Sequence, residues 1–159
     1  MTIQASKMVS GINLPIVLFD GHCNLCNGTV DFILRFERYP TIRFVALQSA
    51  EGEFLSHKLQ IPTGEESVVF WGKDGVKMRS AAAFSIASML IFPFNLLSFF
   101  KILPTPISDA AYNLIARNRI GLFGRKATCR VEADSEYAAR FPILSELELE
   151  IATLELQKK

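Results

Sequence analysis

The chain has few cysteines, almost no excess charge and no apolar leader, and each shortage excludes a class of protein. Three cysteines among 159 residues are too few, and an odd number, for a secreted scaffold held by disulfides. Seventeen basic and sixteen acidic residues give a net charge of +1, without the clustered Lys and Arg of a nucleic-acid-binding protein. Residues 1–15 lack a charged region followed by an apolar stretch, so no signal peptide is predicted. We therefore expect a cytoplasmic protein in a reducing compartment, where a close cysteine pair is typically catalytic or metal-binding.

Charge is also missing from residues 81–100, between Arg79 and Lys101. This length alone suits a transmembrane helix, but Pro93 and several polar residues interrupt the run. The pattern predicts a buried helix ending near Phe92, followed by a second apolar segment. We expect the large apolar side chains of that segment to pack against the sheet of the same chain, with binding at a membrane surface as the alternative. These side chains are Phe94, Leu96, Leu97, Phe99 and Phe100.

What the chain does have is a globular composition. Half of its residues are hydrophobic, and thirteen phenylalanines stand against one tryptophan and three tyrosines. This composition excludes a disordered chain and indicates a thickly packed interior. The length suits one domain, or one domain with an appendage.

Strand and helix patterns alternate along residues 16–90. Short apolar runs predict strands, and the sequence Gly72-Lys73-Asp74-Gly75 predicts a hairpin between the last two of them. The predicted strands span residues 16–19, 42–47, 67–71 and 76–79. The predicted helices span residues 29–39, 51–59 and 81–90, the last with Ser80 as its N-cap. A crossover helix makes the first two strands parallel, whereas the hairpin makes the last two antiparallel.

This order predicts an α/β thioredoxin-like fold, βαβαββα, with a mixed four-stranded sheet and a C-terminal helical extension. We expect residues 14–92 to form the thioredoxin-like core and residues 93–159 to pack on it as the extension, in one domain overall. An amphipathic helix is predicted over residues 108–118, with Arg117 and Arg119 suiting the C-terminal end of its dipole and Gly121-Leu122-Phe123-Gly124 ending it. Its apolar stripe contains Ala111, Leu114 and Ile115. A last helix is predicted over residues 142–156, with Leu147, Ile151 and Leu154 on one face and glutamates on the other.

The candidate redox centre is Cys23-Asn24-Leu25-Cys26, which follows the first strand at the head of a helix. Two cysteines three residues apart at a helix start can approach closely enough for a disulfide. Unpaired amides and the helix dipole stabilise a thiolate at the first position, and the thiolate is the nucleophile in disulfide exchange. We therefore predict an exposed, nucleophilic Cys23 and a resolving Cys26 one turn further in.

Other interpretations of these residues stay open. Zinc sites use the same cysteine spacing, with Cys129, His22 or His57 as further ligands, and the two cysteines could also be inert buried residues. Asp20 either caps the turn or exchanges a proton with Cys26. His22 is predicted to modify the local charge, and Cys129 is a buried thiol or a third redox partner.

At Asp20, Cys23 and Cys26 the sequence resembles the DCC family of predicted thiol–disulfide oxidoreductases, named for an Asp-x-x-Cys-x-x-Cys signature. The resemblance continues through Arg79-Ser80-Ala81 and from Arg117-Asn118-Arg119 to Cys129, and covers residues 14–130. It implies a thioredoxin-like fold and disulfide exchange. Thioredoxins differ in carrying Trp-Cys-x-Pro-Cys at the site and a cis-proline directly before the third strand, whereas here Pro62 lies five residues ahead of Ser67.

The sequence thus predicts an enzyme, a thiol–disulfide oxidoreductase of the protein-disulfide reductase type, with Cys23, Cys26 and Asp20 as catalytic residues. The expected partners are a disulfide-containing protein or small molecule and a reductase or thiol donor that restores the dithiol. No cofactor, metal or nucleic acid is part of the prediction, and a zinc-binding or non-catalytic interaction module is the alternative.

Overall fold

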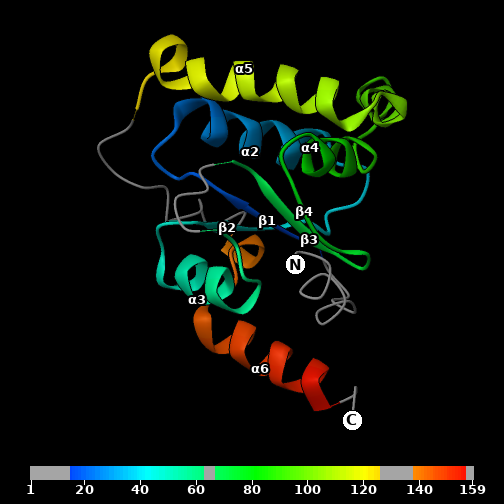
Figure 1. Ribbon diagram of the computed structural model, residues 1–159. Helices are drawn as coiled ribbons and strands as arrows, with labels where there is room; N and C mark the ends of the chain where they lie inside the picture. The colour runs from blue at the N-terminus through cyan, green and yellow to red at the C-terminus, as the bar shows by residue number, and fades with distance from the viewer. Residues whose placement is uncertain (1–14, 63–66, 126–137, 157–159) are drawn as a thin grey trace.

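Four short strands form one mixed sheet at the centre of the computed structural model, which describes residues 15–62, 67–125 and 138–156 (Figure 1). The strands are β1 (Ile16–Phe19), β2 (Arg43–Ala46), β3 (Val69–Gly72) and β4 (Gly75–Met78). Their order across the sheet is β2-β1-β3-β4, with β1 and β2 parallel and the other pairs antiparallel. The predicted βαβαββα order and the thioredoxin-like mixed sheet are confirmed.

Helices cover both faces of the sheet, so side chains alternate along each strand between two apolar cores. Val17 and Phe19 of β1 face α2 (Asn24–Phe36) and α4 (Arg79–Ala87). The neighbouring Ile16 and Leu18 face α3 (Ala50–Lys58) and α6 (Leu144–Leu156) on the opposite side. Figure 1 shows this three-layer arrangement, with α2 and α4 on one side of the sheet and α3 and α6 on the other.

The starts of α2 and α4 differ from the prediction. Helix α2 begins five residues earlier than expected, because Cys23 caps it and Asn24 is already helical. Ser80 is not an N-cap: α4 begins at Arg79, preceded by Met78. The hydroxyl of Ser80 instead donates a hydrogen bond to the carboxylate of Asp109, an acceptor that only the folded C-terminal part brings within reach.

The uncharged run of residues 81–100 is divided between two short elements. Helix α4 ends at Ala87, and the 3₁₀ helix η1 (Phe94–Ile102) follows after a break at Pro93. Within the described part of the chain, no helix is long and apolar enough to cross a membrane. Phe94 packs against Phe32 and Phe36 of α2, with ring centroids 4.8 and 4.9 Å apart. The expectation that the other large apolar residues of η1 pack on the sheet is wrong, because these side chains are exposed.

The longest helix, α5 (Thr105–Phe123), lies across α2 and α4 (Figure 1). Pro106 lies in its first turn, where proline costs no hydrogen bond. Gly124 ends it with φ 77°, a conformation that favours glycine. An amphipathic helix ordinarily buries its apolar stripe, yet α5 buries Ser108 and Arg119 and leaves Leu114 and Ile115 exposed.

The last helix, α6, completes the core on the α3 side of the sheet. Leu147 and Ile151 are buried there, as predicted, whereas the side chain of Leu154 lies outside the described part. A bidentate ion pair joins the helix to the sheet. Arg43 of β2 and Glu150 of α6 form it, with nitrogen–oxygen distances of 2.8 and 3.1 Å.

Gly52 is a sensitive point of this packing, because a Cβ atom there would lie 2.1 Å from the carbonyl oxygen of Ala46. We expect Gly52→Ala to lower the free energy of unfolding by about 1–3 kcal/mol, since α3 must shift away from β2. Gly28→Ala on α2 is the matched control, because a Cβ there meets nothing within 4 Å. Urea unfolding should show this control to be about 0.5–1 kcal/mol more stable than wild type. Equal effects of the two substitutions would contradict the packing described.

Candidate active site

The two cysteines of the Cys-x-x-Cys motif lie at the junction of β1 and α2, as predicted. Cys23 is the N-cap of α2, and its Sγ accepts a hydrogen bond from the backbone N–H of Cys26 at 3.4 Å. Both cysteines are free thiols. Asn27 holds the turn closed, because its side-chain amide donates to the carbonyl oxygens of Gly21 and Cys23 at 2.8 and 2.9 Å.

The exposure of the two cysteines is the reverse of the prediction. Cys23 is fully buried, whereas Cys26 is partly exposed. The cause is the last residue of α5 and the two residues that follow it. Arg125 forms an antiparallel bridge with Cys23, and Asn24 donates to the carbonyl oxygens of Phe123 and Gly124 at 2.8 and 3.4 Å. We call residues 123–125 the covering segment.

A buried arginine that the sequence analysis assigned to the helix dipole lies at the centre of the site. Arg119, 5% exposed, donates to Oδ2 of Asp20 at 3.2 Å and to Sγ of Cys26 at 3.8 Å. Its guanidinium therefore connects the carboxylate to the sulfur. No local pattern marks Arg119 in the sequence, because its partners are 93 and 99 residues away. Its place in the segment that resembles the DCC family is the one signal that could have identified it.

Asp20 is held from several sides at the end of β1, where it is only 1% exposed. Its Oδ1 accepts from the backbone N–H of His22 at 3.0 Å and from the amide of Gln48 at 2.9 Å. Gln48 in turn accepts from the backbone N–H of Gly21 at 3.0 Å. The turn-capping role of Asp20 is therefore present, His22 contributes through its backbone, and Gln48 is a site residue that the sequence analysis missed.

The environment of Cys26 disfavours its thiolate. The pKa of the Cys26 thiol is raised to about 12, most by burial and then by the hydrogen bond to Cys23 and the negative charge on Cys23. The charge of Arg119 opposes this shift. Because the thiolate is the reactive form, Cys26 is a slow nucleophile at neutral pH in the resting protein.

This raised pKa makes a prediction for chemical modification. Alkylation of Cys26 by iodoacetamide, followed by peptide mass spectrometry, should accelerate about tenfold for each pH unit between pH 7 and 10, without a plateau. The same cysteine in urea-unfolded protein should level off near its ordinary pKa of about 8.5. A plateau below pH 9 in the folded protein would show that the thiol is not held in its neutral form.

Cys26 opens onto an apolar cavity of about 300 Å³ between α2, α4 and α5. Asp20 and Arg119 contribute the charged part of its wall, and Tyr112 contributes a phenol whose oxygen accepts from the backbone N–H of Val68 at 3.0 Å. The remaining wall is mainly apolar side chains, among them Leu25, Val30, Ile86, Leu97 and Ile115. The site therefore offers a sulfur and one buried ion pair at the edge of an apolar space.

The alternative of a metal site depends on which potential ligands lie close together. Within residues 15–62, 67–125 and 138–156, no three Cys, His, Asp or Glu side chains gather closely enough to hold a metal ion. Cys129, the third cysteine considered as a zinc ligand or redox partner, lies outside these ranges.

Comparison with known proteins assigns the site to a family. Residues 17–125, more than half of the chain, match the sequence profile described as DCC1-like thiol-disulfide oxidoreductase. The chain belongs to this family. The family is described as one of thiol–disulfide oxidoreductases, and the matched segment runs from β1 to the covering segment, so it contains every residue of the site described above.

Two relatives support the assignment. The chain is 39% identical over 121 residues to the uncharacterized protein YuxK of Bacillus subtilis, an alignment that covers 76% of this chain and 88% of that protein. It is 40% identical over 119 residues to a DCC family protein of Arabidopsis thaliana described as chloroplastic, covering 74% and 69% of the two chains. No solved structure matches the chain significantly.

Proposed function

We propose that this DCC family protein exchanges electrons with disulfides through the Cys23–Cys26 dithiol. The observation that carries the proposal is the position of Cys23 as the N-cap of α2, with its sulfur accepting the N–H of Cys26. A sulfur at the start of a helix, facing backbone N–H groups, is the usual position of the attacking cysteine in a Cys-x-x-Cys motif. Cys26, with its raised pKa, keeps its proton.

In the reductive direction, the Cys23 thiolate attacks one sulfur of the substrate disulfide. A mixed disulfide forms, and the second substrate sulfur leaves as a thiolate that takes a proton from solvent. Cys26 then loses its proton and attacks the Cys23 sulfur, which forms the Cys23–Cys26 disulfide and releases the remaining substrate thiolate. An external dithiol or reductase returns two electrons and one proton, which restores the Cys23 thiolate and the Cys26 thiol, and the oxidative direction is the same sequence reversed.

Access to Cys23 requires the covering segment to move, because the sulfur is fully buried beneath residues 123–125. Two hydrogen bonds from Asn24 hold that segment, and Gly124 supplies a flexible point within it. Opening the segment is therefore the first step of the proposed cycle.

Arg119 and Asp20 act on the resolving step. The guanidinium lies 3.8 Å from the Cys26 sulfur and lowers its pKa against the effect of burial, so it stabilises the thiolate that must form there. Asp20 holds the guanidinium in place at 3.2 Å and is proposed as a positioning residue. The alternative, in which Asp20 takes the Cys26 proton, predicts that Asp20→Asn changes the pH profile of turnover and not only its magnitude.

The apolar cavity beside Cys26 favours a substrate that carries apolar groups next to its disulfide, whether a protein segment or a small molecule. A reducing compartment, the cytoplasm in our proposal, suits a dithiol of this kind.

A redox titration tests the proposal. The protein is equilibrated in dithiothreitol buffers of graded potential and alkylated, and its mass is measured by mass spectrometry. The two reactive thiols should be lost together in one two-electron transition. A midpoint near −270 mV would indicate a reductant and one near −120 mV an oxidant. Independent modification of the two thiols, with no disulfide between them at any potential, would overturn the proposal.

A further inference from the structure

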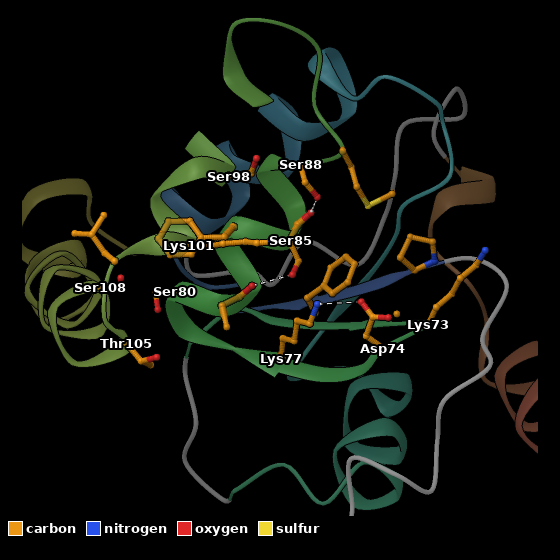
Figure 2. A pocket seen from close by; sticks show the side chains of 17 residues that line it. Lys73, Asp74, Lys77, Ser80, Ser85, Ser88, Ser98, Lys101, Thr105 and Ser108 are labelled. Carbon is orange, nitrogen blue, oxygen red and sulfur yellow. Dashed lines mark hydrogen bonds and ion pairs between the residues drawn. The ribbon is translucent and has the colours of Figure 1, made fainter. Parts of the chain in front are cut away.

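A second cavity, of about 600 Å³, lies on the opposite side of α4 from Cys26. The hairpin of β3 and β4, α4, η1 and α5 line it, and it shares no lining residue with the cavity at the cysteines. Figure 2 shows its labelled side chains, which are hydroxyls and lysines with one carboxylate. Its hydroxyl-bearing residues are Ser80, Ser85, Ser88, Ser98, Thr105 and Ser108.

The charge of this cavity is positive. Lys73, Lys77 and Lys101 line it from the β3–β4 loop, β4 and η1. Asp74 is the one acidic residue in its wall and lies 3.3 Å from the ammonium of Lys77. Three cations against one carboxylate favour an anionic ligand.

Helices α4 and α5 both begin at the cavity, and the Asp109 carboxylate, which accepts the Ser80 hydroxyl, lies at the start of α4. Helices α4 and α5 have no acidic residue in the first turn and no side-chain hydrogen bond to the cap. By contrast, Ser49 caps α3, and Glu51 and Glu53 lie in its first turn. A helix start without a capping side chain carries a partial positive charge and favours a bound anion.

A buried hydroxyl points to the same ligand. Ser108, in the first turns of α5, is 9% exposed and lines the cavity, and its Oγ has no hydrogen-bond partner within the described residues. Buried hydroxyl groups are ordinarily satisfied, so this unpaired one is available to donate to a ligand when its side chain turns toward the cavity.

From these observations we propose that the cavity binds a small phosphorylated molecule. A phosphate group combines the charge that the lysines and helix starts favour with oxygens that accept from serine hydroxyls. Phe70, Phe84 and Leu103 supply an apolar wall for the organic part of the ligand. Asp109, the nearby carboxylate of α5, already accepts the Ser80 hydroxyl and is not part of the cavity wall.

Calorimetric titration of the full chain with inorganic phosphate, pyrophosphate and adenosine monophosphate tests this site, with adenosine as the uncharged comparison. We expect adenosine monophosphate to bind more tightly than adenosine, and the double variant Lys77→Ala/Lys101→Ala to weaken its binding about tenfold or more. Ser108→Ala should weaken it about threefold to tenfold, as the loss of one hydrogen bond does. Lys58→Ala, on α3 at the far side of the sheet, should have no effect.

Failure of all three phosphates to bind below about 10 mM, well above the usual range for small ligands, would overturn the proposal. Equal weakening by Lys58→Ala would do the same, because it would show only non-specific attraction. The Cys23–Cys26 redox midpoint is read in the same preparations, so a failure of this site is separable from a failure of the proposed redox function.

An independent observation concerns the exposed side of α5 and η1. Apolar side chains at helical spacing on α5 are exposed to solvent, and large side chains of η1 are exposed beside them. We call these residues the apolar face. Its members are Leu96, Leu97, Phe99, Phe100, Ile102, Ile107, Leu114, Ile115 and Leu122. So large an exposed apolar surface marks an interaction site.

The charged side chains near the apolar face indicate which partner it binds. Among residues 94–123 the exposed charged side chains are the cations Lys101 and Arg117, while Arg119 is buried and Asp109 accepts the Ser80 hydroxyl. A second copy related by a two-fold axis would bring the same cations together with no exposed carboxylate to pair them. We infer that the apolar face docks on an anionic lipid bilayer, which takes up both apolar side chains and cations. Leu97 and Ile115 also line the cavity at Cys26, so docking would turn that cavity toward the lipid.

Co-sedimentation with phosphatidylglycerol-containing vesicles tests this inference. The full chain should sediment with them at low salt and should sediment less with pure phosphatidylcholine vesicles. Leu114→Glu, at a side chain 66% exposed, should abolish sedimentation. Leu149→Glu is the matched control, because this leucine of α6 is 71% exposed on the opposite side of the sheet and should leave binding unchanged.

The absence of sedimentation with anionic vesicles would overturn the inference. A concentration-dependent dimer in light scattering, removed by Leu114→Glu and accompanied by no vesicle binding, would identify a second copy as the occupant instead.

Discussion

Replacing Cys23 with serine is expected to reduce turnover of a test disulfide to the uncatalysed rate, a loss of roughly a thousandfold or more, typical of a removed nucleophile. Cys26→Ser should behave differently, because Cys23 can still attack. Without the resolving thiol, the mixed disulfide with the substrate should accumulate and be visible by mass spectrometry. The difference follows from the structure, in which the Cys23 sulfur accepts an amide hydrogen bond and the Cys26 thiol keeps its proton.

Cys129→Ser is the control for the third cysteine and should retain turnover. The reverse outcome, in which Cys26→Ser is inactive toward the substrate and Cys23→Ser forms the trapped adduct, would assign the attack to the sulfur that opens onto the apolar cavity. The order of the two roles would then be wrong, while the redox function would stand.

Replacing Arg119 with methionine is expected to lower the free energy of unfolding by about 3–5 kcal/mol, the range for breaking a buried ion pair by removing one partner. Asp20 would remain 1% exposed without its counter-charge. The double variant Asp20→Asn/Arg119→Met should recover part of the loss, because no charge is then left uncompensated. Arg43→Met, which breaks the more exposed pair with Glu150, should cost about 1 kcal/mol or less.

Urea unfolding of the four proteins in the cycle, from wild type to the double variant, measures the coupling directly. The redox proposal adds a second readout: Arg119→Met should slow the resolving step more than Arg119→Lys, since lysine keeps the positive charge near the Cys26 sulfur. A cycle in which the two single substitutions simply add would show that Asp20 and Arg119 do not support each other.

The strand and helix order could be predicted because it depends on local patterns. The apolar run of β1, the Asp-Gly turn before β4 and the helix that follows the cysteines each appear within a few residues of sequence. The continuous apolar run Ile16–Phe19 is typical of a strand buried on both faces, and the two cores confirm this.

The residues of the site could be predicted only in part, because several of them reach it from distant segments of the chain. Arg119 and the covering segment reach the cysteines from almost a hundred residues away, and Gln48 reaches Asp20 from 28. The position of Cys23 at a helix start suggested an exposed sulfur, but exposure depends on which distant residues pack over it. The stripe on α5 was likewise visible in the sequence, whereas its direction depended on Arg119 turning inward.

The pairing of Arg119 with Cys26 also has a consequence for the newly made protein. At ordinary synthesis rates of 5–20 residues per second, the 93 residues that separate the two take roughly 5–20 s to be added. During that interval the cysteines have neither the covering segment nor the guanidinium beside them. The nascent chain is therefore most vulnerable to oxidation before α5 has been completed, and a chain that ends before residue 119 would keep that vulnerability permanently.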